Sequence, residues 1–340
     1  MELITKLFKY LWNQTIRIKS KFWFKMKTTE QIIKLLGDCI ATRTFVDSFM
    51  RTNETFPFDQ LLDYSYNKNV VISTDFGGED PSSDYFIYTA TFSTYKPAYD
   101  WMHLIQEKFK ELGYNKPPQY KEIPKPAKEG KFVDFIKLSE KYFKGFVISL
   151  AVPKNIETIF AHSLENIYNE VKNKSNIPNF SLSPKNTEKA LRISLLISIT
   201  LYTLKFHTQK GGYFWISDKD SIAKITEKEN HFENTVMIQM NILQSLLDGN
   251  LPNPISYSLP WKGDEEDLSY TLIALNDLFS GALADFFTNS PYGQSSPINS
   301  AKDKSSSILY YSKEIPKFFY RIIQDGDIFY GSRIEIDVDK

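Results

Sequence analysis

Short β-branched or apolar runs between long helical segments constrain this chain most strongly. Residues 145–152, GFVISLAV, have the pattern of a buried strand, which Pro153 ends. Residues 69–75, NVVISTD, have the same character, and residues 85–93 follow them after a turn rich in Gly, Pro and Ser. Residues 212–217, GYFWIS, predict a later strand. Runs of this length indicate strands that are buried inside a sheet covered by helices.

Helical spacing predicts most of the remaining elements. We expect helices over residues 28–50, 96–112, 131–143, 155–173, 187–206, 228–248, 268–288 and 308–324, and further short strands at 119–123 and 332–338. A meander of strands followed by strand–helix alternation is typical of an α/β fold with a mixed sheet between helices. The spacing shows no second core, so we expect one domain over residues 61–340, preceded by a helical segment over residues 1–60.

The first 27 residues differ from the rest of the chain in charge. Apolar side chains recur there at helical spacing, at Leu3, Ile4, Leu7, Phe8, Leu11 and Trp12. Residues 1–29 carry seven Lys or Arg and one acid, and no small-residue cleavage site of a signal peptide follows. The pattern predicts a basic amphipathic helix. It either docks on the body or serves a protein partner or a membrane surface.

The composition excludes several classes of protein. Lys+Arg and Asp+Glu number 41 each, so the formal net charge is zero and a strongly basic nucleic-acid binder is not indicated. Cys39 is the only cysteine. An intramolecular disulfide is therefore impossible, which is typical of a reducing compartment such as the cytoplasm. No apolar run approaches the roughly 18 residues of a transmembrane helix.

Acidic residues stand where the predicted strands end. Asp75 ends one strand, Asp218 and Asp220 directly follow another in WISDKDSI, and Asp277 lies in an apolar helix with Asp285 as a reserve candidate. Carboxylates at strand ends of an α/β sheet converge on the carboxyl edge. An aspartate among buried apolar residues costs free energy unless it is paired or binds metal. Each acid alone could be a turn former, a helix cap or a partner of a lysine, but together they predict a shared site.

Carboxylates in such a set are hard oxygen ligands, which suit Mg²⁺ or Mn²⁺. Two such ions about 4 Å apart activate water and stabilise the leaving oxygen in phosphodiester cleavage. The sequence therefore predicts a divalent-metal site at one edge of the sheet.

The order of these motifs resembles the RNase H-like superfamily, and within it a large bacterial and phage family. The motifs are VVISTDFGGED, YKEIPKPAKEGKFVDFIKLSEKYFKGFVISLAVPKN, WISDKDSI and, at 277–283, DLFSGAL, over roughly residues 65–290. The resemblance implies an RNase H-like mixed sheet with extra N-terminal helices and helical insertions. It also implies a two-metal nuclease acting on DNA or RNA, in a mobile-element or anti-phage defence setting.

The resemblance assigns a role to each candidate residue. Asp75 would bridge two metals, and Asp220, then Asp218, and Asp277 would complete the ligand shell. Lys121 would orient phosphate or the attacking water. Two positions depart from the family pattern: Gln119 stands where an acid is expected, and so does Phe76. Glu122 and Glu79 are the nearby acids that could replace them, although the register of a strand would point Glu122 away.

Two other interpretations remain open at the level of the sequence. A catalytically weak or inactive RNase H-like protein would keep the fold and act as a binding or scaffold protein, which Gln119 favours and the retained aspartates oppose. The Asp218-Lys219-Asp220 segment also matches the Asp-x-Asp motif of glycosyltransferases, which follows a strand and binds Mn²⁺. No nucleotide-sugar signature accompanies it here.

Overall fold

The computed structural model of the chain describes eleven ranges of residues. They are 39–66, 68–123, 130–160, 163–204, 211–226, 229–247, 255–259, 268–289, 308–309, 311–325 and 328–335. The basic segment of residues 1–27 lies outside these ranges, so its helix remains a prediction.

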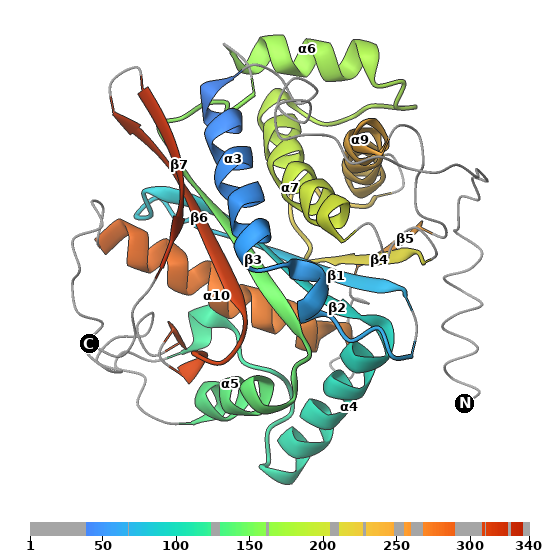
Figure 1. The fold of residues 1–340 in the computed structure, drawn as a ribbon, viewed down its shortest axis with the longest axis vertical. Coiled ribbons are helices and arrows are strands. Elements are labelled where there is room, and N and C mark those ends of the chain that lie inside the picture. The colour runs from blue at the N-terminus through green and yellow to red at the C-terminus, as the bar shows by residue number, and fades with distance from the viewer. Residues whose placement is uncertain are drawn as a thin grey trace.

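A seven-stranded mixed sheet forms the centre of the described part of the chain (Figure 1). Its strands are β1 (Val70–Gly77), β2 (Tyr85–Thr94), β3 (Gly145–Pro153), β4 (Tyr213–Ser217), β5 (Ile255–Ser258), β6 (Lys317–Asp325) and β7 (Ile328–Ile334), in the order β5-β4-β1-β2-β3-β6-β7. The first three strands form an antiparallel meander. β4 joins β1 in parallel, β5 joins β4 in parallel, and β6 joins β3 in parallel. Five strands therefore end at the same edge of the sheet, and β2 and β7 run the other way.

Helices cover both faces of the sheet and enclose a hydrophobic core on each side (Figure 1). One face carries α3 (Ile40–Thr55), α6 (Leu164–Lys174), α7 (Pro184–Thr203) and α9 (His231–Leu246). The other carries α4 (Tyr95–Glu111), α5 (Lys131–Tyr142) and α10 (Ser269–Asn289). This arrangement confirms the predicted α/β class with a mixed sheet between helices.

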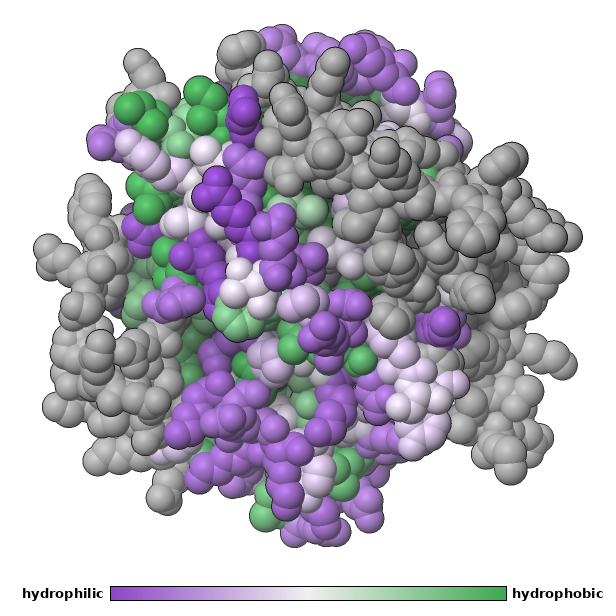
Figure 2. Space-filling model, in the orientation of Figure 1, coloured by the Kyte–Doolittle hydropathy of each residue, from purple (hydrophilic) through white to green (hydrophobic). Residues whose placement is uncertain are grey.

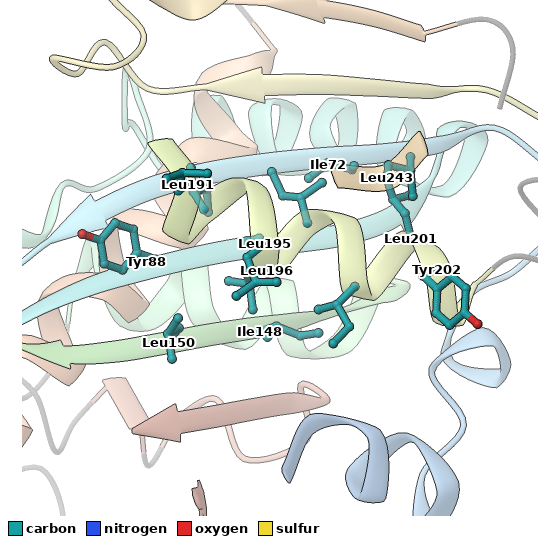
Figure 3. Close-up of a cluster of buried hydrophobic side chains, with 14 of the residues drawn as sticks. Ile72, Tyr88, Ile148, Leu150, Leu191, Leu195, Leu196, Leu201, Tyr202 and Leu243 are labelled. Atoms are coloured by element: carbon teal, nitrogen blue, oxygen red, sulfur yellow. The ribbon is translucent and has the colours of Figure 1, made fainter. Parts of the chain in front are cut away.

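The helix α7 is buried along nearly its whole length because it lies between the sheet and α9. Ser183 caps its first turn by accepting a hydrogen bond from the Asn186 amide at 3.3 Å, and Pro184 is its first residue. Figure 3 shows Leu195 and Leu196 of this helix over Ile148 and Leu150 of β3. Burial of large aliphatic side chains of this kind contributes about 1.5–3 kcal/mol each.

Two predicted elements are wrong, and the strands β5 and β6 were not expected. Residues 119–123 are not a strand, because Tyr120–Glu122 form a short 3-10 helix, η2. Residues 308–324 are not one helix, because Pro316 lacks the amide hydrogen that a helix interior needs and β6 begins directly after it. The unexpected strand β5 has only four residues at the edge of the sheet, too few for a periodic pattern.

The part of the predicted 1–60 segment that the structure describes packs into the main core. Phe45 and Phe49 of α3 are buried there, and the ring of Phe49 stacks on Tyr320 of β6 at 5.4 Å between centroids. Thr42 Oγ1 donates a hydrogen bond to the carbonyl oxygen of Ile159 at 2.5 Å. Residues 39–60 therefore share one hydrophobic core with the sheet.

The surface on the face drawn in Figure 2 is mostly hydrophilic where it is described, and its hydrophobic residues lie in small separate groups. Ile328 and Tyr330 of the edge strand β7 are among the exposed large hydrophobic residues. Within the described ranges, no helix combines the length and the apolar character that crossing a bilayer requires.

Candidate functional site

Asp75, two residues before the end of β1, and Asp218, directly after β4, lie side by side. Thr74 of β1 lies opposite Ser217 of β4, and the Asp218 amide donates a hydrogen bond to the Thr74 carbonyl oxygen at 3.1 Å. Asp75 directly follows Thr74, and Asp218 directly follows Ser217, along these two parallel segments. Side chains alternate across a strand, and Ile216 belongs to the core on the α10 side. Asp218, two residues on, therefore faces α10 as Asp75 does.

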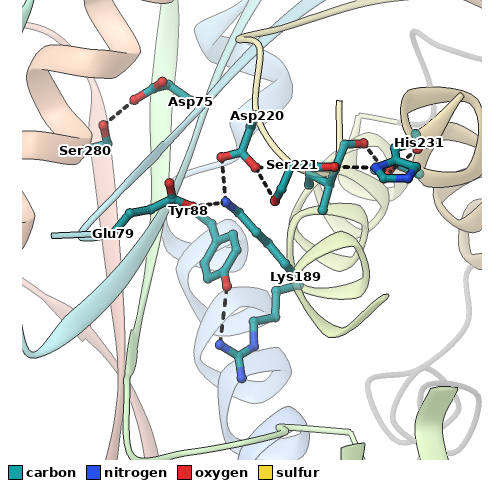
Figure 4. Close-up of polar contacts among 11 residues, drawn as sticks. Asp75, Glu79, Tyr88, Lys189, Asp220, Ser221, His231 and Ser280 are labelled. Carbon is teal, nitrogen blue, oxygen red and sulfur yellow. Dashed lines mark hydrogen bonds and ion pairs between the residues drawn. The ribbon is translucent and has the colours of Figure 1, made fainter. Parts of the chain in front are cut away.

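A serine of α10 holds Asp75 in place. Asp75 is buried, and Ser280 Oγ donates a hydrogen bond to its Oδ2 at 2.5 Å (Figure 4). Strand and helix approach closely here, since a Cβ added at Gly77 would lie 2.6 Å from the Ser280 carbonyl oxygen. Glycine at 77 thus allows the contact that orients the Asp75 carboxylate.

The DLFSGAL motif also ties α10 to η2. The Tyr120 amide donates a hydrogen bond to Asp277 Oδ2 at 2.6 Å, and the Tyr120 hydroxyl donates to Asp285. A Cβ added at Gly281 would lie 2.2 Å from Cδ1 of the Tyr120 ring. Asp277 and Gly281 therefore position the segment that carries Gln119 and Lys121 beside the sheet edge.

Gly281→Ala is expected to destabilise the protein by about 1–3 kcal/mol, because the new methyl group overlaps the Tyr120 ring and must displace it. Alanine in a helix is otherwise favoured over glycine by about 1 kcal/mol. Urea denaturation of Gly281→Ala and of Gly281→Ala in a Tyr120→Ala background separates the two effects. The substitution should be stabilising once the ring is absent, and a gain in stability in the wild-type background would contradict the argument.

The three facing carboxylates share one electrostatic environment. Burial raises the pKa of Asp75 well above its usual range, and repulsion from Asp277 and Asp218 raises it further. Burial also raises the pKa of Asp218, with a contribution from Asp220, while the charge of Lys121 acts in the opposite direction. Asp75, Asp218 and Asp277 therefore carry closely spaced negative charge, and Lys121 stands near enough to Asp218 to affect its titration.

Asp220 belongs to a different cluster, on the α7 side of the sheet edge. Its Oδ2 is 2.5 Å from Nζ of Lys189, which also pairs with Glu79 (Figure 4). Ser221 Oγ donates to the second carboxylate oxygen of Asp220 at 2.7 Å. The sequence ranked Asp220 before Asp218 as a ligand, whereas the structure puts Asp218 beside Asp75 and pairs Asp220 with a lysine.

The remaining candidates lie at the surface. Glu122 pairs with Lys116 at 3.4 Å and is exposed, as is Lys121. Gln119 directly precedes η2 with an extended backbone. The structure therefore brings together Asp75, Asp218 and Asp277 with Lys121 nearby, and leaves Glu122 in a separate surface ion pair.

Two residues that contact the candidate aspartates, Ser280 and Lys189, were not singled out from the sequence. Ser280 lies inside the DLFSGAL motif, so the motif carried a signal for it without revealing its hydrogen bond to Asp75. Lys189 carried no signal, because its place beside Asp220 depends on how α7 packs against the sheet.

The donor set fits a hard divalent ion in atom type and in charge. Asp75 is buried, and two other carboxylates repel its negative charge. A divalent cation would compensate this excess of negative charge. Within the described residues, no group of three His, Cys, Asp or Glu side chains stands ready to hold a metal ion. An ion would therefore have to draw these carboxylates together on binding. No protein-family model matches this chain, and no curated protein matches it significantly.

Proposed function

We propose that this protein is a divalent-metal-dependent nuclease, with Asp75, Asp218 and Asp277 as its metal-binding carboxylates. One observation carries the proposal: aspartates from β1, from the end of β4 and from α10 lie near one sheet edge, where burial and then the other two raise the pKa of Asp75. Perturbed carboxylates gathered in this way are more common at functional sites than elsewhere.

The strand arrangement supports an RNase H-like assignment within the α/β class. An antiparallel meander of β1, β2 and β3 is extended beside β1 by the parallel strands β4 and β5. This order is compatible with the mixed sheet that the resemblance implies, and β6 and β7 are added beside β3. Asp75 and Asp218 stand at the carboxyl edge of the neighbouring parallel strands β1 and β4, where ligands bind in α/β sheets.

The residues around the aspartates would orient them for an ion. Ser280 holds one oxygen of Asp75, and the Tyr120 amide holds one oxygen of Asp277. Hydrogen bonds to ligating carboxylates fix their direction and tune their affinity. Bound Mg²⁺ or Mn²⁺ would supply an activated water and polarise the phosphoryl oxygen. Lys121, an exposed cation close to Asp218, would bind the substrate phosphate.

Nucleic acid, DNA or RNA, is the proposed substrate. A mobile-element or defence setting and a cytoplasmic location rest on the resemblance and on the single cysteine. The basic segment of residues 1–27 is a proposed contact for a protein partner.

Cleavage of a mixed panel of DNA and RNA in Mn²⁺ tests the proposal. Wild type is expected to cleave at least one substrate, and Asp75→Ala is expected to lower the rate by about 1000-fold, because transition-state charge stabilisation at this site depends on the bound ion. Asp100→Ala is the matched control, since Asp100 is an exposed aspartate of α4 paired with Lys96. Equal rates for wild type and Asp75→Ala would overturn the assignment of Asp75.

A binding or scaffold protein is the second candidate. It is favoured by the absence, among the described residues, of a ready-made group of metal ligands, and by the pairing of Asp220 with Lys189. Thermal unfolding distinguishes the two, because an ion that binds only the folded state at about 100 times its Kd adds about 2.7 kcal/mol of stability. A melting temperature that does not change in Mn²⁺ favours the scaffold. The Asp-x-Asp glycosyltransferase interpretation stays a prediction from the sequence: Asp220 pairs with Lys189, yet it is near enough to Asp218 to raise the pKa of that carboxyl.

A further inference from the structure

Lys189 of α7 places a largely buried positive charge at the same sheet edge. Its side chain is 12% exposed, and its ammonium lies 2.5 Å from Asp220, which is 10% exposed. The same ammonium pairs with Glu79 and sits 4.8 Å from the centre of the Phe76 ring. A lysine buried this far is rare unless it is paired. Figure 4 shows the two carboxylates, Asp220 and Glu79, that pair with this one.

The partners of Lys189 come from the two chain segments that carry the candidate ligands. Glu79 lies four residues beyond Asp75, after β1, and Asp220 lies two residues beyond Asp218, after β4. Burial opposes the charge on Lys189, but Asp220 and Glu79 outweigh it and raise the pKa of the lysine. The ammonium therefore remains protonated at neutral pH and bridges the two loops.

We propose that the Lys189 ammonium occupies the position of a second divalent ion, so that this centre takes up one metal ion per chain instead of two. The inference rests on the proposed metal site of Asp75, Asp218 and Asp277. A second ion needs carboxylates of its own beside the first site. Asp220, which is near enough to Asp218 to raise its pKa, and Glu79 are both bound to Lys189. Lys189 thereby supplies a fixed positive charge on the side of the sheet edge opposite α10.

Charge balance explains why replacing Lys189 with an uncharged residue should allow a second ion to bind. With Lys189, the cluster of Lys189, Asp220 and Glu79 has a net charge of −1; without it, the two carboxylates carry −2. Hard oxygen ligands with that charge suit Mn²⁺. Methionine has nearly the length of lysine without its charge, so Lys189→Met would empty a position lined by two carboxylates.

The test counts Mn²⁺ bound per folded chain in the full-length protein, by equilibrium dialysis with the free ion measured by electron paramagnetic resonance. Wild type is expected to bind one ion and Lys189→Met two. Lys96→Met is the matched control and should bind one, because Lys96 also pairs with an aspartate and faces a tyrosine ring at 5.9 Å, but on the exposed surface of α4. Lys189→Met with Asp220→Asn should lose the added ion.

The readout separates this inference from the proposed function. Equal counts for wild type and Lys189→Met overturn the role of Lys189, and so does a wild-type count of two. A third outcome is that wild type binds no ion and Lys189→Met binds one. That result would overturn the proposed metal site of Asp75, Asp218 and Asp277, while supporting the inference that Lys189 fills a cation position. If the methionine variant does not fold, Lys189→Gln gives the same count, because glutamine can still donate a hydrogen bond to Asp220 and has no charge.

Discussion

Asp75→Asn is expected to raise the melting temperature of the metal-free protein while removing its stabilisation by Mn²⁺. Asp75 is buried, and its pKa is raised well above the usual range by burial and by Asp277 and Asp218. At neutral pH the wild-type carboxylate is therefore penalised in the folded state. Asparagine has the same shape and no charge, and its amide oxygen can accept the hydrogen bond that Ser280 donates to Asp75.

The gain from Asp75→Asn should depend on pH in a defined direction. Between the unfolded pKa of an aspartate, about 3.9, and the raised folded pKa, the folded state binds more protons than the unfolded state. Wild-type stability therefore falls as pH rises through this window, and the advantage of the asparagine variant grows until the folded pKa is passed. Asp80→Asn is the control, because hydrogen bonds from Ser82 lower the pKa of this exposed aspartate.

Melting temperatures of the three proteins from pH 4 to pH 8, in a chelator and then in Mn²⁺, provide the measurement. We expect the order of stability of wild type and Asp75→Asn to reverse when the ion is added. A metal-free Asp75→Asn protein that melts below wild type at pH 8 would show that Asp75 is stabilised as an anion in the absence of metal, contrary to the electrostatics of this site.

Arg192→Met is expected to destabilise the protein by about 3–5 kcal/mol, because it leaves a buried carboxylate without its cation. Arg192 and Glu188 of α7 are each 3% exposed, and Nε donates to Glu188 Oε1 at 2.9 Å. The guanidinium also donates to the carbonyl oxygens of Ile156 and Glu157, both at 3.1 Å. The pair therefore fastens α7 to the segment that follows β3.

Lys174→Met is the matched control for this loss. Glu170 and Lys174 of α6 form an ion pair with the same spacing of four residues and the same order, but the side chains are 54% and 75% exposed. An exposed pair of this kind contributes about 0.5 kcal/mol or less. In chemical denaturation at pH 7, the free energy of unfolding should fall much more for Arg192→Met than for Lys174→Met. Adding Glu188→Gln to Arg192→Met should recover part of the loss, since it removes the unpaired charge.

The main strands and the α/β class could be predicted because their signals are local. The runs at residues 69–75, 145–152 and 212–217 are short and apolar and end at turn residues or acids, and β1, β3 and β4 form there. The prediction from local pattern was wrong where one stretch of sequence suits both a helix and a strand. Residues 308–324 have apolar spacing that also suits a helix, and pairing with β3 and β7 makes β6 a strand.

The sequence by itself determined that Asp75 and Asp218 stand near the carboxyl ends of two strands, whereas the parallel pairing of β1 with β4 that makes them neighbours is tertiary. An acid at the end of each of two neighbouring parallel strands must lie at the same sheet edge, and alternation along a strand decides its face. Only the tertiary structure decided that Asp220 pairs with Lys189, that Ser280 holds Asp75, and that η2 replaces a strand beside α10. These contacts join residues far apart in the chain, and they depend on how helices and loops pack against the sheet, which no local periodicity specifies.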